Sequence, residues 1–151
     1  MIDKPNVPYP RLIDILLVDD DEGDILLAKR ALEESKIINT MHIAKDGVEA
    51  MDYLQQQGKH ADAARPDLIL LDLNMPRVDG REVLANIKRD PELRSIPVVV
   101  LTTSDSEQDI VNMYNSHANG YVTKPVDLDQ FTKIVRAIGD FWFSVVRLPP
   151  R

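Results

Sequence analysis

Two kinds of segment alternate along this chain, and they differ in how often an apolar residue recurs. Short continuous runs of apolar, often β-branched residues end in polar residues, whereas longer segments place an apolar residue every three or four positions. The short runs predict five strands, at residues 13–18, 40–44, 68–71, 98–101 and 120–123. The longer segments predict five helices, at residues 23–36, 48–57, 80–89, 107–115 and from residue 127 onward.

This alternation predicts an α/β fold with a doubly wound, five-stranded parallel sheet of (βα)5 order. The strands are apolar at nearly every position, so helices are expected to cover both faces and to form three layers. In such folds ligands bind at the carboxyl ends of the strands. We therefore look for chemistry in the residues that follow each strand.

The chain divides into three expected parts. Residues 1–11 contain three prolines and predict an extended arm, and residues 12–139 form one domain. Residues 140–151 extend the last helix, and nothing after Gly139 is long enough for a further output domain. The polar connection 55–65 is long, and no chemistry is assigned to it.

Composition narrows the possible functions. The chain has 151 residues and no cysteine, which excludes disulfides, thiolate metal sites and cysteine nucleophiles. A net charge of −7 without a basic, aromatic-rich cluster argues against nucleic-acid binding. Neither a membrane span nor a signal peptide is visible, so we expect a cytoplasmic protein.

Polar side chains gather where four of the predicted strands end. Asp19 and Asp20 follow the first strand, Asp72 the third, Thr102 the fourth and Lys124 the fifth. Carboxylates at one sheet edge repel each other, and a hard divalent cation such as Mg²⁺ removes that repulsion. Helix capping is the simpler explanation for acidic residues after the first strand, and we assign capping and surface charge to the next two, 21 and 22.

These motifs together resemble the receiver domain of two-component response regulators, which has a flavodoxin-like fold. The matching segments are 15–20, 44–50, 67–76, 79–80, 97–102 and 120–125. The resemblance implies that Asp72 is the phosphoacceptor, assisted by Lys124. It also implies a switch made of Thr102 and Tyr121. The implied Mg²⁺ ligands are Asp19 (through water), Asp20, Asp72 and the backbone carbonyl of Asn74.

The same resemblance implies a partner and an output. A sensor histidine kinase donates the phosphoryl group, and the regulator then signals through altered protein contacts. The three histidines lie outside the matching motifs, so the chain resembles a phosphoacceptor and not a phosphohistidine donor. It catalyses only its own phosphorylation and dephosphorylation.

The C-terminal segment is unusually rich in aromatic residues. Its apolar surface looks too wide for one core-facing stripe, and we predict a homodimer interface there. The predicted interface residues are Phe141, Trp142, Phe143, Val145 and Val146. This tail and the long 55–65 connection are also similar to regulators paired with phytochromes, which implies a red-light-sensing kinase as partner.

Two alternatives remain open from the residues alone. A magnesium-dependent phosphohydrolase of the haloacid dehalogenase type would use Asp19 as its nucleophile, but it leaves Asp72 and Lys124 unexplained. A scaffold that works without phosphorylation would need none of the acidic residues, the threonine or the lysine.

Overall fold

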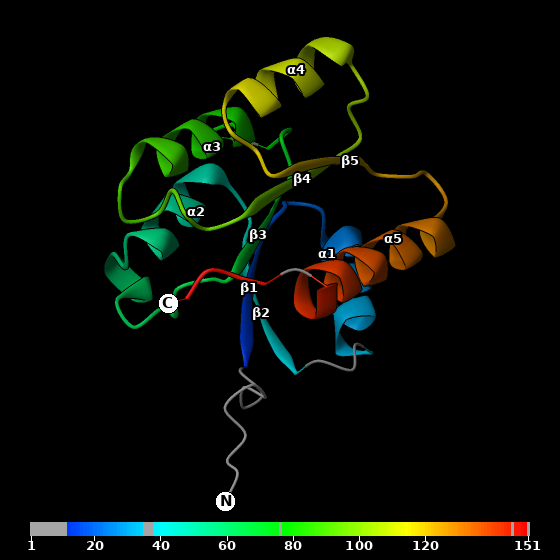
Figure 1. Cartoon of the computed structure of the whole chain (residues 1–151), viewed down its shortest axis with the longest axis horizontal. Coiled ribbons are helices and arrows are strands. Elements are labelled where there is room, and N and C mark those ends of the chain that lie inside the picture. The colour runs from blue at the N-terminus through cyan, green and yellow to red at the C-terminus, as the bar shows by residue number, and fades with distance from the viewer. Residues whose placement is uncertain (1–11, 35–37, 76, 146, 151) are drawn as a thin grey trace, which may run out of the picture.

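The computed structural model describes residues 12–34, 38–75, 77–145 and 147–150, and it contains one parallel sheet. The predicted arm, residues 1–11, lies outside the described residues. The sheet has five strands in the order β2-β1-β3-β4-β5 (Figure 1). Their bounds are β1 Ile13–Val18, β2 Asn39–Ala44, β3 Leu68–Leu71, β4 Val98–Thr102 and β5 Gly120–Thr123. The predicted doubly wound, three-layer architecture is confirmed.

Helices cover both faces of the sheet. Figure 1 shows α2, α3 and α4 on one side of the sheet and α1 and α5 on the other. Their bounds are α1 Glu22–Glu33, α2 Gly47–Leu54, α3 Gly80–Arg89, α4 Glu107–Asn115 and α5 Leu128–Asp140. A π-helical turn, Phe141–Val145, follows α5. No helix among the described residues is long and apolar enough to cross a membrane.

Each α-helix begins with a side chain that accepts a hydrogen bond from a backbone N–H of its first turn. The capping residues are Asp21, Asp46, Asp79, Ser106 and Asp127. Such caps satisfy donors that the helix itself leaves free, and each one stabilises its helix by about 1 kcal/mol. The predicted capping role of Asp21 is confirmed, because its carboxylate accepts from the backbone N–H of Asp24 at 3.0 Å.

Alternate strand residues divide the core into two clusters. In β1, Leu16 and Val18 pack toward α2, α3 and α4, whereas Ile15 and Leu17 pack toward α1 and α5. All four of these side chains are almost completely buried. Burial on both faces fixes the strand register, because a one-residue slip would exchange the two sets. This fixed register determines which side chains meet at the sheet edge.

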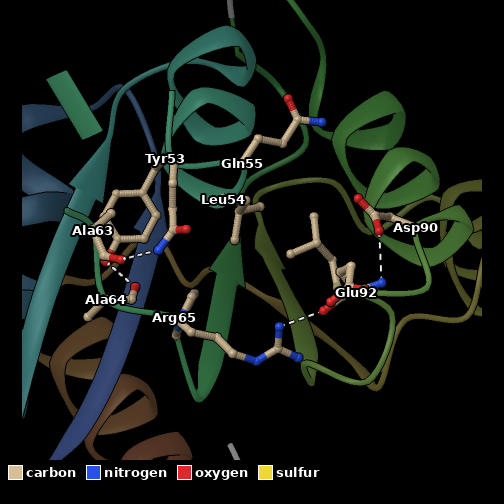
Figure 2. A pocket seen from close by; sticks show the side chains of 11 residues that line it. Tyr53, Leu54, Gln55, Ala63, Ala64, Arg65, Asp90 and Glu92 are labelled. Carbon is tan, nitrogen blue, oxygen red and sulfur yellow. Dashed lines mark hydrogen bonds between the residues drawn. The ribbon is translucent and has the colours of Figure 1, made fainter. Parts of the chain in front are cut away.

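The 55–65 connection is partly ordered as a short 3-10 helix, Gly58–His60. With the turn that follows α3, it encloses a hollow of about 430 Å³. Figure 2 shows Tyr53 and Arg65 on one side of this hollow and Glu92 on the other, with Arg65 donating to the Glu92 carbonyl. The lining residues come from the ends of helices and the starts of strands, so this hollow lies at the edge of the sheet opposite the acidic residues.

Candidate functional site

Backbone pairing extends one residue beyond the strands at the carboxyl edge of the sheet. Asp72 N–H donates to the Val18 carbonyl at 2.9 Å, and Lys124 N–H donates to the Thr102 carbonyl at 2.7 Å. Val18 is paired with Leu71, so Asp19 and Asp72 leave neighbouring strands at the same level. The sheet therefore brings together side chains that are far apart in the sequence.

Three acidic side chains converge at this edge. Carboxylate oxygens of Asp19, Asp20 and Asp72 all lie within 4.8 Å of one another. Asp19 and Asp72 are buried, at 1% and 8% exposure, whereas Asp20 is exposed. Three oxygen donors at this separation, one of them open to solvent, suit a hard divalent cation that keeps some of its water. The donor set fits Mg²⁺ or Mn²⁺ and does not include the nitrogen or sulfur ligands typical of zinc.

Lys124 supplies the positive charge of the site. Its Nζ donates to Asp19 Oδ2 at 2.7 Å, to Asp24 Oδ2 at 2.9 Å and to Asp72 Oδ2 at 3.3 Å. Burial alone would lower the pKa of Lys124, but the hydrogen bonds that it donates to Asp19 and Asp24 outweigh this effect and raise that pKa. Lys124 therefore stays charged at neutral pH, opposite the carboxylates.

Asp19 and Asp72 are both buried, but their oxygens are engaged differently. One oxygen of Asp19 accepts from Lys124, and the other accepts from the Asp21 backbone N–H at 2.9 Å. Burial raises the pKa of Asp19, although these hydrogen bonds oppose the effect. The Asp72 oxygens have longer contacts, 3.3 Å from Asn74 N–H to Oδ1 and 3.3 Å from Lys124 to Oδ2. Asp72 is thus the less tightly bonded carboxylate and the better candidate nucleophile.

The first residue of α3, Gly80, packs so closely on the backbone of Asp72 that only glycine fits there. A Cβ there would lie 2.1 Å from the Asp72 carbonyl oxygen, and the Gly80 N–H donates to the Leu73 carbonyl at 3.1 Å. The first residue of α3 therefore packs directly on the backbone that carries Asp72. Only a residue without a side chain permits that approach.

Thr102 and Tyr121 are connected through the loop between β4 and α4. Thr102 is fully buried, and its Oγ1 lies 3.5 Å from the Ser104 backbone nitrogen. Tyr121 is half-buried against the core cluster that lies between the sheet and helices α2, α3 and α4. Its hydroxyl donates to the Ser104 carbonyl at 2.8 Å. Ser104 Oγ donates in turn to Asp109 at 2.7 Å, and two guanidinium nitrogens of Arg81 donate to the same carboxylate. A movement of Thr102 can therefore reach Tyr121 and α4.

The predicted dimer residues lie at the other end of the molecule, after α5. Trp142 and Phe143 are half-buried and pack against the core cluster that lies between the sheet and helices α1 and α5 of their own chain. Phe141 is 50% exposed and stacks edge-to-face on Trp142, with ring centroids 5.7 Å apart. The side chains of Val145 and Val146 lie outside the described residues. Among the described aromatic side chains of this segment, only Phe141 is largely free of the core.

The sequence-based prediction omitted Asp24. It lies in the first turn of α1, where an acidic residue is readily explained by the helix dipole. Its contact with Lys124 joins residues that are 100 positions apart, and no local pattern indicates it. The acidic neighbour Glu22 does not cap α1, because Asp21 does so, and it forms a surface ion pair with Lys45 instead.

Comparison with known proteins identifies relatives over nearly the whole chain. The model of the response regulator receiver domain family matches residues 15–136. Response regulator Rcp1 of Synechocystis sp. is 48% identical over 149 residues, covering 99% of this chain and 99% of Rcp1.

Solved structures of similar proteins agree with this fold. The crystal structure of the phosphorylated cyanobacterial phytochrome response regulator RcpA superposes with a TM-score of 0.90 at 51% identity, covering 93% of this chain and 100% of RcpA. The Mn²⁺-bound form of Rcp1 superposes with a TM-score of 0.89 at 48% identity, covering 91% of this chain and 99% of that one.

Proposed function

Because this chain belongs to the response regulator receiver domain family, we propose that Asp72 accepts a phosphoryl group from a sensor histidine kinase. The observation that carries the proposal is the meeting of Asp72 with two further carboxylates and the Lys124 ammonium at one sheet edge. The protein works as a regulator in the cytoplasm, and the only reactions it catalyses are its own phosphorylation and dephosphorylation.

The transfer itself needs an ionised carboxylate and a way to spread charge. An Asp72 oxygen forms a bond to phosphorus while the bond from phosphorus to the donor atom breaks, and the leaving group departs with that electron pair. The Lys124 ammonium, 3.3 Å from Asp72, is placed to stabilise the charge on the transferring oxygens. It does so without giving up a proton, since its pKa is raised.

Mg²⁺ is the proposed cofactor. Asp19, Asp20 and Asp72 would hold it, and the backbone carbonyl of Asn74 would be a further ligand. When bound, the cation neutralises charge on the carboxylates and on the phosphoryl group. The Mn²⁺-bound structure of Rcp1 supports a divalent ion in this type of site.

The output is a change in protein contacts that starts at Thr102. A phosphoryl group brings close to two negative charges and new acceptor oxygens to Asp72. The Thr102 hydroxyl, fully buried at the neighbouring strand end, would donate to one of them. The loop through Ser104 then transmits the change to Tyr121 and biases the surface around α4, β5 and α5.

The haloacid dehalogenase alternative is less consistent with the geometry. That mechanism needs Asp19 as nucleophile, yet both Asp19 oxygens already accept hydrogen bonds and the side chain is 2% exposed. A scaffold would not need a buried cluster of charged residues, and burying charge costs folding free energy, so the scaffold alternative leaves this cluster unexplained. Phosphoacceptor chemistry at Asp72 uses the whole cluster.

The direct test is labelling by a small phosphodonor such as acetyl phosphate in the presence of Mg²⁺. Asp72→Asn should abolish labelling, whereas Asp105→Asn, which removes an exposed carboxylate in the β4–α4 loop, should be labelled like the parent. Acid-labile label that persists in Asp72→Asn protein would refute the assignment.

We propose a phytochrome-type histidine kinase as the partner. The support is the similarity to Rcp1 and to the phytochrome response regulator RcpA, at 48% and 51% identity. Phosphotransfer profiling should compare a phytochrome kinase with other histidine kinases at short reaction times. Preferential transfer from the phytochrome kinase is expected, and equal or slower transfer from it would contradict this pairing.

We also propose that the chain forms a homodimer through the segment after α5. Phe141 is the described side chain best placed for this contact, because it is half exposed while Trp142 and Phe143 pack on their own core. Phe141→Glu should shift the protein to monomer in sedimentation. Leu26→Glu is the matched control, since Leu26 is also 50% exposed but lies on α1. Sedimentation of Phe141→Glu like the parent would exclude this interface.

A further inference from the structure

Besides Asp19 and Asp72, a third carboxylate, that of Asp24, accepts a hydrogen bond from Lys124. Its Oδ2 lies 2.9 Å from Lys124 Nζ, which is shorter than the 3.3 Å from Lys124 to Asp72. We propose that Asp24 is a positioning residue that orients the Lys124 ammonium for phosphoryl transfer to Asp72. The proposal rests on the function assigned above, and it adds a residue that the receiver-domain motifs do not include.

The first turn of α1 fixes the Asp24 carboxylate in place. Asp21 caps the helix by accepting from the Asp24 backbone N–H, which anchors the backbone of this residue. The Asp24 side chain is 25% exposed, compared with 2% for Asp19 and 10% for Asp72. Asp24 therefore approaches Lys124 from the solvent side, while the other two carboxylates approach it from the sheet.

This arrangement uses every donor of the ammonium group. A lysine Nζ carries three N–H donors, and here they meet Asp19, Asp24 and Asp72. The two shorter bonds hold two donors, so the third is directed at Asp72 through the longest contact. When Asp72 becomes an acyl phosphate, that third donor can turn to a phosphoryl oxygen without breaking either of the other bonds.

The role of Asp24 is therefore to reduce the freedom of a flexible side chain before the reaction. Lysine has a four-carbon stem, and an ammonium held on one side only would sample several positions. Preorganised charges stabilise a transition state better than charges that must reorient. Asp24 acts through Lys124 and not on the transferring group.

A purely electrostatic effect of Asp24 would have the opposite sign. A carboxylate at the mouth of the site repels an anionic phosphodonor, so its removal would lower the donor concentration needed for half-maximal rate. Loss of lysine orientation instead lowers the maximal rate at saturating donor. The two effects are separated by measuring the rate of phosphorylation over a range of acetyl phosphate concentrations at saturating Mg²⁺.

The test compares Asp24→Asn with Glu22→Gln. Glu22 lies in the same helix turn, is 74% exposed and pairs with Lys45, so Glu22→Gln removes the same charge without touching Lys124. We expect the maximal rate of Asp24→Asn to fall about tenfold, as for loss of one partly exposed charge-assisted hydrogen bond. Glu22→Gln should keep the parental maximal rate, and Asp24→Glu should recover part of the loss.

A double-mutant cycle distinguishes an effect of Asp24 that acts through Lys124 from a general effect on the structure. In a Lys124→Gln background, Asp24→Asn should cause no further loss, because the residue it positions is gone. A parental maximal rate for Asp24→Asn would overturn the proposal, as would equal losses in the two backgrounds. If the parent itself is never labelled, the proposed function fails instead, and the two failures remain distinct.

Discussion

Replacing Asp20 with asparagine should stabilise the protein when no metal is present. Its carboxylate lies within 4.8 Å of carboxylate oxygens of Asp19 and Asp72, and the Lys124 ammonium compensates only one of those two charges. Asp20→Asn keeps the shape of the side chain and removes its charge. The variant therefore relieves a net repulsion that the metal-free fold must otherwise tolerate.

The magnitude follows from Coulomb's law for one uncompensated unit charge at 4.8 Å. The repulsion is about 3.5 kcal/mol at an effective dielectric constant of about 20, and about 0.9 kcal/mol at about 80. Asp20 is exposed, so solvent screening favours the lower part of this range, about 1–2 kcal/mol. For a domain of this size that gain corresponds to a rise in Tm of about 2–8 °C.

Thermal unfolding with EDTA and with Mg²⁺ separates the repulsion between the carboxylates from the effect of metal binding. Mg²⁺ at one hundred times its Kd should stabilise the parent by about 2.7 kcal/mol and so raise its Tm. It should raise the Tm of Asp20→Asn far less, because a ligand is missing. An Asp20→Asn protein that is no more stable in EDTA, or that gains as much from Mg²⁺ as the parent, would refute this account of the acidic cluster.

Three further predictions concern other parts of the fold. Gly80→Ala should cost at least about 2 kcal/mol of stability and slow labelling, because its methyl group would overlap the backbone carbonyl of Asp72. A parental urea midpoint would contradict the close packing. Tyr53→Phe should cost about 1 kcal/mol by losing the 2.7 Å hydrogen bond to the Ala64 carbonyl. Burial raises the pKa of Tyr53 from 10.0 to about 12. The difference in unfolding free energy between the parent and Tyr53→Phe should therefore be full below pH 10.0 and shrink as the pH rises toward about 12. A pH-independent difference in urea unfolding would argue against this effect. Arg81→Met should leave Asp109 with only the hydrogen bond from Ser104 and loosen the β4–α4 loop, which faster amide hydrogen exchange there would show. Unchanged exchange would show that the ion pair does not restrain the loop.

Most of the fold follows from short-range patterns in the sequence. The bounds predicted for α3, α4 and β5 agree with the structure, because each element is marked at both ends by a capping or turn residue. The second helix was predicted to reach residue 57 but ends at Leu54. Gln56 there adopts a left-handed backbone conformation, with φ of 55°, although no glycine marks the position.

The site was predictable where it depended on strand order, and not where it depended on helix orientation. Asp72 and Lys124 follow parallel strands, so their meeting at one edge is a consequence of topology. Asp24 reaches the same lysine only because of how α1 is seated on the sheet. Trp142, which the sequence predicts in a dimer interface, lies in the π-helical turn after α5 and is half-buried against the core of its own chain.

The central claim, that Asp72 carries the phosphoryl group, is tested most directly by mapping the modified residue. The protein is phosphorylated with acetyl phosphate and Mg²⁺, reduced with borohydride, digested and sequenced by mass spectrometry. An acyl phosphate on an aspartate is reduced to homoserine, so the account predicts that this conversion occurs at Asp72 and requires the phosphodonor. Conversion at Asp19 with Asp72 unchanged would contradict the account and favour a phosphohydrolase.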